Sequence, residues 1–294
     1  MAGNGNIDFF CLECYTDKSE VNTLQTEVIK IDRENMDLDV LKRAGEILKS
    51  GGLVAFPTET VYGLGGDGLH EESSRKIYEA KGRPSDNPLI VHVADMEHLE
   101  KIVKKVPKAA YKLAEAFWPG PMTMILEKND LVPYGTTGGL DTVAIRMPSD
   151  PIALELIRQG GGYIAAPSAN TSGRPSPTTA QHVYEDLQGK IPMILDGGAV
   201  TIGLESTIVD LTEEIPTILR PGFISLDMVQ AVLGEAQIDR GLIANDSNIH
   251  PKAPGMKYRH YAPKADLKIV EGPMEQVISY INEQAEKGRT GIIC

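Results

Sequence analysis

The chain has 294 residues, 41% of them hydrophobic and 24% charged, which is an ordinary balance for a folded globular protein. Its 29 Lys and Arg residues stand against 41 Asp and Glu residues. The resulting net charge of −12 argues against a surface that coats nucleic acid, because such a surface must neutralise phosphates. No apolar run approaches the roughly 18 residues of a membrane span, and no basic segment precedes an apolar one at the N-terminus. We therefore expect a soluble cytoplasmic protein without a membrane partner.

Residues 1–25 are expected to form a weakly ordered N-terminal extension. It contains the CxxC pair Cys11 and Cys14, whose spacing is compatible with redox or metal chemistry. A zinc site needs more ligands, however, and the chain has no second pair. Free thiols are therefore the favoured interpretation, and no metal site is predicted.

Helices and strands alternate over residues 26–236, but several strands follow one another directly. The expected strands are 26–31, 53–56, 89–93, 122–126, 142–147, 163–166, 193–195, 206–211 and 217–219. The expected helices are 37–50, 71–81, 95–106, 107–117, 152–158 and 225–234, and one more is expected to start where Ser176 caps Pro177. This order predicts an α/β fold with a twisted, mixed sheet flanked by helices, because a purely parallel sheet needs a crossover between successive strands.

Several chemically active residue types lie at the ends of the elements predicted within residues 53–93. Thr58 and Thr60 follow the first strand among glycines, which let the backbone approach a ligand closely. The next helix ends at Lys81, Arg83 lies two residues beyond it, and the following strand carries His92. Because ligand sites of α/β sheets lie at such strand ends, this segment predicts a binding site.

A glycine motif in the same segment is a weak signal. Gly63, Gly65 and Gly68 match GxGxxG, and Asp86 follows at roughly the distance of a ribose ligand. A dinucleotide site needs those glycines directly after the strand, whereas residues 57–62 intervene, so we interpret the match as chance. The chain contains neither a GxxxxGK[ST] phosphate loop nor a GxSxG nucleophile motif.

Four cations are candidates for a shared anion site. Arg146 lies inside one predicted strand and Arg220 closes another, and a guanidinium among apolar strand residues needs an anion or a carboxylate partner. For each arginine alone, a salt bridge and a ligand contact are equally favoured, whereas for Lys81 and Arg83 alone a solvated helix end is favoured. Four cations at element ends in one domain nevertheless favour a polyanionic ligand, because their donors match phosphate oxygens.

Small polar residues at other strand ends have simpler structural explanations. Ser168 and Asn170 follow one predicted strand and Ser206 begins another, and such residues favour turns. A histidine inside an apolar strand, as His92 is, is more often a core histidine with satisfied ring nitrogens than a ligand contact. From the residues alone, these structural roles are the favoured ones.

Eight sequence blocks occur in one order along the chain: PTETVYGLG, KGRPSDNPLIVH, WPGPMT, VAIRMP, APSANTSGRPSPT, ESTIVD, LRPG and PGMKYRHYAP. Together they resemble the Sua5/YrdC family of L-threonylcarbamoyladenylate synthases over roughly residues 26–265. The resemblance implies a YrdC-like α/β fold, in which a twisted mixed sheet and its flanking helices surround a concave pocket. It also implies the activity of a nucleotidyltransferase.

The resemblance implies a specific reaction. L-threonine and bicarbonate combine to an N-carboxylated threonine, whose carbamate oxygen attacks the α-phosphate of ATP, so that pyrophosphate leaves and threonylcarbamoyl-AMP forms. A magnesium ion (Mg2+) on the phosphates is expected. The product is expected to feed the N6-threonylcarbamoyl modification of tRNA adenosine by hand-off to the tRNA threonylcarbamoyl-transfer complex, with direct tRNA binding weak or indirect.

The matching motifs also imply roles for individual residues. Lys81 and Arg83 are the expected catalytic residues. The expected ATP-binding residues are Lys81, Arg83, Asn87, Ser168, Asn170, Ser176, Arg220 and Tyr258. The expected threonine-binding residues are Thr60, His92, Arg146, Ala166 and Ser206.

Residues 237–264 have little periodicity and many polar side chains, so we expect a linker, and its Tyr258 block resembles a lid over the phosphates. Residues 265–294 predict a strand (267–270), a helix (274–285) and a strand (290–294), a unit that cannot close a core alone. Longer family members carry a Rossmann-like domain in this place, and the resemblance makes residues 265–294 its truncated beginning.

Two other classes of protein compete with this interpretation. An RNA-binding module of the same fold would hold duplex RNA or tRNA in a basic cavity, and the net charge of −12 disfavours it. A carbamoyl-transfer domain of hydrogenase maturation proteins would come with zinc-finger and acylphosphatase segments, which this sequence does not contain.

Overall fold

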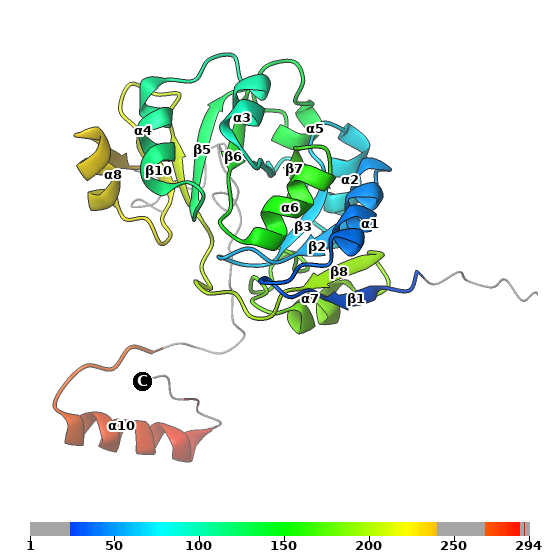
Figure 1. The fold of residues 1–294 in the computed structure, drawn as a ribbon. Coiled ribbons are helices and arrows are strands. Elements are labelled where there is room, and N and C mark those ends of the chain that lie inside the picture. The colour runs from blue at the N-terminus through cyan, green and yellow to red at the C-terminus, as the bar shows by residue number, and fades with distance from the viewer. Residues whose placement is uncertain (1–23, 240–267, 289–290, 292–294) are drawn as a thin grey trace, which may run out of the picture. The chain divides into compact units, whose positions relative to one another are not determined.

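The computed structural model describes residues 24–239, 268–288 and 291, and an eleven-stranded sheet lies at the centre of the first range (Figure 1). The strands are β1 (Glu27–Lys30), β2 (Val54–Phe56), β3 (Gly63–Asp67), β4 (Ile90–His92), β5 (Met122–Glu127), β6 (Thr142–Arg146), β7 (Ile164–Ala165), β8 (Met193–Asp196), β9 (Thr207–Asp210), β10 (Thr217–Arg220) and β11 (Gln237–Ile238). Their order is β1-β8-β2-β3-β7-β4-β6-β5-β9-β10-β11. Parallel pairs such as β4–β6 occur beside antiparallel pairs such as β5–β6, which confirms the predicted mixed sheet.

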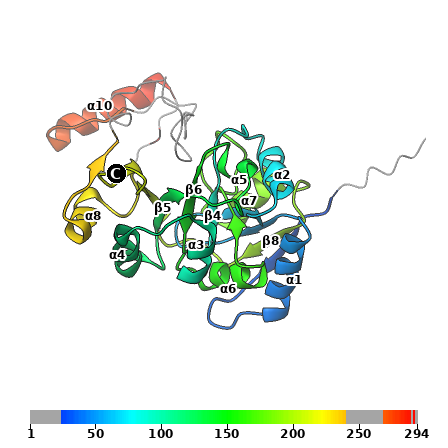
Figure 2. The same cartoon turned by 90° about the horizontal axis from the view of Figure 1, so that it is seen from above.

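Helices cover both faces of this sheet (Figure 2). They are α1 (Leu38–Lys49), α2 (Glu71–Lys81), α3 (Met96–Ile102), α4 (Lys108–Phe117), α5 (Tyr134–Thr137), α6 (Pro151–Gln159), α7 (Ala180–Leu187) and α8 (Leu226–Leu233). On one face α1 and α6 pack against β2, β7 and β8, and α3, α4 and α8 pack against β4, β5, β6 and β9. On the other face α2 and α7 pack against β2, β3, β7 and β8. Because successive side chains along a strand point to opposite faces, Phe56 joins one core and Ala55 the other.

One region of the second face is covered by none of the described helices. Its apolar cluster consists only of strand side chains, namely Ile90, Ile125, Ala144, Ile208 and Leu219. The neighbouring residues Val91 and Ile145 point the other way, into the core beneath α3 and α4. We refer to this part of β4, β6, β5, β9 and β10 as the open face.

The strand β3 was not predicted, because its glycines conceal any alternation of apolar and polar side chains. The glycines serve close packing between strands: a Cβ on Gly65 would lie 2.8 Å from Ile164 Cγ2, and one on Gly63 would lie 3.2 Å from Phe56 Cζ. Gly63 and Gly65 thus lie inside a strand rather than in a phosphate-binding loop. The interpretation of GxGxxG as a chance match is therefore confirmed.

The predicted helix start at Ser176 is wrong, because α7 begins at Ala180 with the side chain of Thr179 as its N-cap. The backbone carbonyls of Pro177 and Thr178 accept hydrogen bonds of 2.9 and 3.0 Å from the backbone of two other loops. Residues 177–178 are therefore tied to their neighbours as a loop and are not available for the first helical turn.

The chain divides into two compact units, Met1–His260 and Tyr261–Cys294. In the second unit the structure describes α10 (Met274–Lys287), which confirms the predicted helix. Residues 268–270 form no strand, contrary to prediction, and the described part of this unit offers no partner strand to receive their hydrogen bonds. Tyr258 and nearly all of the predicted strand 290–294 lie outside the described residues.

The proposed domain boundaries stay predictions. The strand β11 lies in the stretch predicted as linker, where it pairs in parallel with β10. None of the helices in the described ranges is both long and apolar enough to cross a membrane.

A glycine in the middle of α1 gives a test of the packing between α1 and α6. A Cβ on Gly45 would lie 2.6 Å from the backbone of Gln159, which α6 places against it. Glycine to alanine inside a helix normally stabilises by about 0.5–1 kcal/mol, whereas overpacking a core costs about 1–3 kcal/mol. We expect Gly45→Ala to lower the free energy of unfolding in urea by about 1–2 kcal/mol. Glu46→Ala, at the next and exposed position, is the control and should leave it nearly unchanged; equal stabilities would contradict this account of the packing.

Candidate functional site

Four buried polar side chains lie beside one another at one end of the open face. His92 pairs directly with Arg146 across β4 and β6, and Arg146 pairs directly with Thr123 across β6 and β5. The hydroxyl of Ser206, just before β9, lies 2.7 Å from that of Thr123. These residues lie two positions along their strands from the apolar cluster of the open face, so the strand period places them on the same face. The pairing of the strands therefore builds a polar row at the rim of the open face.

Arg146 forms a buried ion pair with Glu59, which lies in the loop after β2. Its Nη2 donates to Glu59 Oε1 at 2.7 Å, and its Nε donates to the carbonyl of Gly120 at 3.4 Å. The second carboxylate oxygen of Glu59 accepts from the backbone N–H of Ser149 at 3.1 Å. Among the described residues, the Nη1 group of Arg146 donates to no protein atom. Arg146 thus has the carboxylate partner that its burial requires and keeps donors for a ligand.

His92 is a buried, neutral imidazole. Burial, together with the charge of the adjacent Arg146, lowers the pKa of His92 to about 3. Its Nδ1 lies 3.1 Å from the carbonyl of Ile90, which can only accept, so Nδ1 carries the proton. Its ring meets the ring of Phe56 edge to face with centroids 6.1 Å apart. His92 is therefore held in one orientation beside Arg146.

Ser206 connects the polar row to Arg220 at the end of β10. Arg220 Nε and Nη2 donate to the Ser206 carbonyl at 3.1 and 2.9 Å, and Nη2 also reaches the Ser206 hydroxyl at 3.1 Å. Burial lowers the pKa of Arg220 to about 10; Glu205 opposes this effect, while Arg146 and Arg83 add to it. Arg146 and Arg83 therefore lie within electrostatic reach of Arg220.

Lys81 organises the loop after β7. Its Nζ donates to the carbonyls of Ser168 and Asn170, both at 2.5 Å, and its residue is only 1% exposed. Burial lowers the pKa of Lys81 well below its ordinary value, and the nearby Arg83 lowers it further. One N–H of the ammonium group remains for another acceptor.

The side chains of Ser168 and Asn170 differ in what they leave for a ligand. Ser168 Oγ donates to Asn170 Oδ1 at 2.6 Å, and Asn170 Nδ2 donates to the carbonyls of Thr171 and Arg174. Both amide hydrogens of Asn170 are therefore used within the loop. Ser168 keeps its lone pairs, so it presents an acceptor to a donor such as a ribose hydroxyl.

The hydroxyl of Thr60, like that of Ser168, is left as a hydrogen-bond acceptor. Thr58 Oγ1 donates to the carbonyl of Val61 at 2.6 Å and lies 2.9 Å from Thr60 Oγ1. Because the one hydroxyl hydrogen of Thr58 is used there, Thr60 donates to Thr58 and offers its own lone pairs to other groups. The buried Thr60 is therefore an acceptor for an N–H donor.

Ser176 lies close to the same cations. Its hydroxyl donates to Glu205 Oε1 at 2.5 Å, and Glu205 is the carboxylate that acts on the pKa of Arg220. A half-buried carboxylate therefore lies between the two ATP-binding residues expected on this side of the site, Ser176 and Arg220.

Asn87 carries a buried acceptor without a partner. The residue is 2% exposed and its Oδ1 accepts no hydrogen bond, while its backbone carbonyl accepts from Tyr78 and Arg83. An unsatisfied buried acceptor costs about 1–3 kcal/mol. A ligand donor, such as the exocyclic amine of a purine, would remove that cost.

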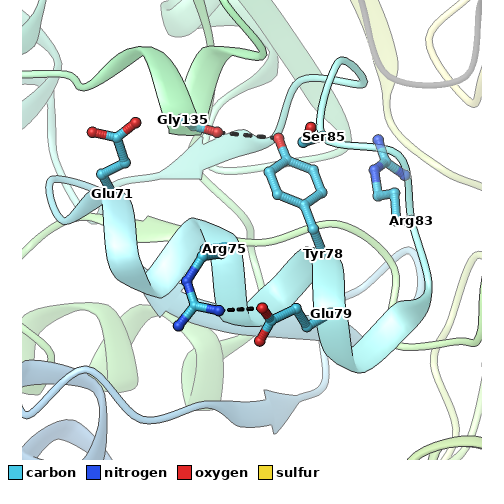
Figure 3. A pocket seen from close by; sticks show the side chains of 7 residues that line it. All are labelled: Glu71, Arg75, Tyr78, Glu79, Arg83, Ser85 and Gly135. Atoms are coloured by element: carbon cyan, nitrogen blue, oxygen red, sulfur yellow. Dashed lines mark hydrogen bonds and ion pairs between the residues drawn. The ribbon is translucent and has the colours of Figure 1, made fainter.

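Arg83 also borders a separate hollow of about 400 Å³ on the outer side of α2 (Figure 3). The hollow is lined by Glu71, Arg75, Tyr78, Glu79, Arg83, Ser85 and Gly135. Within it Arg75 pairs with Glu79, and the Tyr78 hydroxyl donates to the carbonyl of Gly135 at 3.2 Å. Arg83 is its only member among the predicted site residues, so the hollow lies at the edge of the predicted site.

The structure brings most of the predicted residues to the open face or to the loops at its rim. Ala166 lies at the end of β7, where its N–H donates to the carbonyl of Ile90 at 2.8 Å. Tyr258 lies outside the described residues. Three residues that contact the predicted set were missed: Glu59, Thr123 and Glu205. A usable signal existed for Glu59, which is the only charged residue from position 53 to position 66, since a lone carboxylate in an apolar segment needs a cation.

The fold and this site together define a class: an α/β protein that gathers cations and small polar groups at a face of a mixed sheet that none of the described helices covers. Comparison with known families is specific. Residues 46–222 match the Sua5/YciO/YrdC family, described as "Telomere recombination", and residues 224–294 match a family described as "Threonylcarbamoyl-AMP synthase, C-terminal domain". The chain therefore belongs to the Sua5/YrdC family.

Individual relatives agree with this assignment. The threonylcarbamoyl-AMP synthase of Pyrococcus abyssi is 52% identical over 255 residues, which cover 87% of this chain and 75% of the relative. The enzyme of the same name from Bacillus subtilis is 51% identical over 250 residues, covering 85% and 72%. The crystal structure of P. abyssi Sua5 complexed with L-threonine superposes with a TM-score of 0.84 at 48% identity, over 91% of this chain and 81% of that one.

The low pKa of His92 predicts a dependence of stability on pH. In the unfolded chain a histidine takes up a proton near pH 6.5, whereas in the folded chain His92 does so only near pH 3. Between these values the unfolded state binds more protons, so the free energy of unfolding falls as the pH falls. From pH 7 to pH 5 this loss is about 2 kcal/mol. In urea titrations at both pH values, the free energy of unfolding of wild type should fall by about 2 kcal/mol more than that of His92→Gln. Equal decreases would show that His92 is not a buried neutral group.

Proposed function

We propose that the chain is a threonylcarbamoyl-AMP synthase, a nucleotidyltransferase that makes threonylcarbamoyl-AMP and pyrophosphate from L-threonine, bicarbonate and ATP. The observation that carries the proposal is the convergence of Arg83, Arg146 and Arg220 at the rim of one open sheet face. Positive charges that lie this close together favour an anionic ligand, and a triphosphate beside an amino-acid carboxylate supplies one. The names of the relatives with 51–52% identity support the same activity.

The amino acid is proposed to bind at the polar row. Arg146 offers its Nη1 donors to the threonine carboxylate, and a guanidinium fork matches a carboxylate in shape. Thr60 offers lone pairs to the threonine nitrogen, and Ser206, which already accepts from Arg220, is near enough to the row to contact the same ligand. His92 and Ala166 are proposed to border this subsite, His92 as a neutral wall beside Arg146. The L-threonine complex of P. abyssi Sua5 supports an amino-acid site in this fold.

The nucleotide is proposed to bind along the cations and the loop after β7. Arg83 and Arg220 face the phosphates, the free lone pairs of Ser168 accept from a ribose hydroxyl, and Asn87 Oδ1 accepts from the purine amine. Lys81 and Asn170 hold the loop in place, and the remaining N–H of Lys81 is available to a phosphate oxygen. Ser176 is proposed to exchange Glu205 for the nucleotide. Tyr258 remains an expected ATP-binding residue from its motif alone.

The proposed reaction does not require a covalent bond between the protein and a substrate. The threonine nitrogen adds to the carbon of bicarbonate and water is lost, which gives the carbamate. A carbamate oxygen then attacks the α-phosphate, and the bond to the β-phosphate oxygen breaks as pyrophosphate leaves. Positioning the two reactants and neutralising the negative charge that develops on the phosphates supply most of the rate in such transfers. Guanidinium groups held rigidly on strands and helix ends suit that task.

A magnesium ion is proposed to accompany the triphosphate. Magnesium prefers oxygen ligands and is commonly held by one or two carboxylates together with substrate phosphates. The described residues contain no group of three or more His, Cys, Asp or Glu side chains placed to hold a metal, and Glu205 is the carboxylate beside Ser176 and Arg220. These residues therefore fit an ion carried mainly by the nucleotide, where it would screen phosphate charge.

The proposal predicts pyrophosphate release that depends on ATP, L-threonine and bicarbonate together. Arg83→Ala is expected to lower kcat/KM by about 100-fold or more, because it removes one donor to charge that develops in the transition state. The matched control is Arg75→Ala on the same helix, whose exposed guanidinium pairs with Glu72 and Glu79, and its activity should stay within about 2-fold of wild type. Pyrophosphate release that does not require threonine would refute the proposed reaction.

A hand-off of the product to the tRNA threonylcarbamoyl-transfer complex and a cytoplasmic location stay predictions. The competing RNA-binding class predicts tight tRNA binding that weakens steeply with salt. A gel shift with tRNA at two salt concentrations separates this class from the proposed enzyme, for which we expect weak binding.

A further inference from the structure

We propose that Glu59 is a positioning residue for the amino-acid subsite, an inference that rests on the proposed function. Glu59 is not among the site residues expected from the family motifs. Its carboxylate acts through Arg146 rather than on the substrate. Glu59 is 8% exposed and lies between Thr58 and Thr60 in the loop after β2. It is held by contacts from two separate parts of the chain, residues 146–149 and residues 201–202.

The side chain of Glu59 contacts the first of these parts at two residues. Oε1 accepts from Arg146 Nη2 at 2.7 Å, and Oε2 accepts from the N–H of Ser149, three residues beyond the end of β6, at 3.1 Å. Because each oxygen has a different donor, the carboxylate plane is fixed, and with it the plane of the guanidinium. The Nη1 donors of Arg146 are thereby aimed in one direction.

The backbone of Glu59 contacts the second part. Its carbonyl accepts from the N–H of Ile202 at 2.9 Å and from the hydroxyl of Thr201 at 3.2 Å, and the next carbonyl, of Thr60, accepts from Gly203 at 3.0 Å. These residues lead directly into Ser206 and β9. One residue therefore sets the distance between the guanidinium of Arg146 and the segment that carries Ser206.

If Glu59 acts only through its charge, removing its carboxylate should strengthen threonine binding. If Glu59 positions Arg146, the same change should weaken it. Glu59→Gln deletes a negative charge next to Arg146, which by charge alone would strengthen the binding of an anionic carboxylate. However, the amide of glutamine has one acceptor oxygen and one NH2 group. It can satisfy either Arg146 or Ser149, and it turns a donor toward the other. If Glu59 acts by positioning, threonine binding must weaken despite the more positive site.

The test is calorimetric titration of the full chain with L-threonine and separately with ATP. We expect Glu59→Gln to raise the Kd for threonine about 10-fold or more while the Kd for ATP changes less than about 3-fold. In steady-state assays the effect should appear mainly in the KM for threonine. Glu59→Asp keeps both oxygens one methylene farther back, so it should fold like wild type and bind threonine with intermediate affinity.

Asp150→Asn is the matched control. Asp150 is also a buried carboxylate paired with an arginine, Arg33 at 2.9 Å, but it caps α6 and contacts none of the predicted site residues. We expect this variant to lower the melting temperature and to keep the wild-type Kd for threonine. If it weakens threonine binding as much as Glu59→Gln does, Glu59 has only a general structural role and the inference is overturned.

The remaining outcomes are also decisive. Unchanged or tighter threonine binding by Glu59→Gln, or unchanged binding by Glu59→Asp if the glutamine variant does not fold, overturns the inference alone. A wild-type chain that neither binds threonine nor releases pyrophosphate overturns the proposed function as well. The activity of the wild type therefore distinguishes the two failures.

Discussion

The constraint on which the site depends is the partial or complete burial of several positive charges on a sheet face that none of the described helices covers. Arg146 projects from a strand whose opposite face is packed under α3 and α4, and it is only 4% exposed, so it does not reach bulk water as surface arginines do. Arg220, at the end of β10, is half-buried. A buried guanidinium without partners costs several kcal/mol, and the chain meets this requirement with Glu59 and with the carbonyl of Ser206. The Nη1 group of Arg146, which these partners do not use, is available to a ligand.

The strand pairing converts this constraint into a geometry. The register of β4, β6 and β5 sets His92, Arg146 and Thr123 side by side, and a shift of one residue in any of these strands would turn its polar residue to the helix-covered face. The apolar side chains two positions along each strand form the floor of the open face. The same alternation that builds the core on one face therefore builds the polar row on the other.

Local sequence signals predicted the elements well where a cap or a period marked them. Asp37 and Gly51 bounded α1, and Ser225 capped α8. Asp95 capped α3, but the predicted end at residue 106 was wrong: α3 ends at Ile102, because Val103 is extended and pairs with Lys128. Local signals did not reveal β3, whose glycines are required by side chains of other strands rather than by local geometry. The start of α7 was placed too early because hydrogen bonds from distant loops decide where residues 177–178 go.

The sequence by itself determined the mixed α/β class, the residue types of the site and, through eight ordered motifs, the family to which the chain belongs. Each of these depends on local propensity or on short sequence motifs, which can be recognised without knowledge of the tertiary structure. The tertiary structure alone decided which groups face a ligand: that Arg146 pairs with Glu59, and that Lys81 binds the carbonyls of Ser168 and Asn170. These are contacts between segments far apart in sequence, and burial and strand register, which no local pattern encodes, determine them.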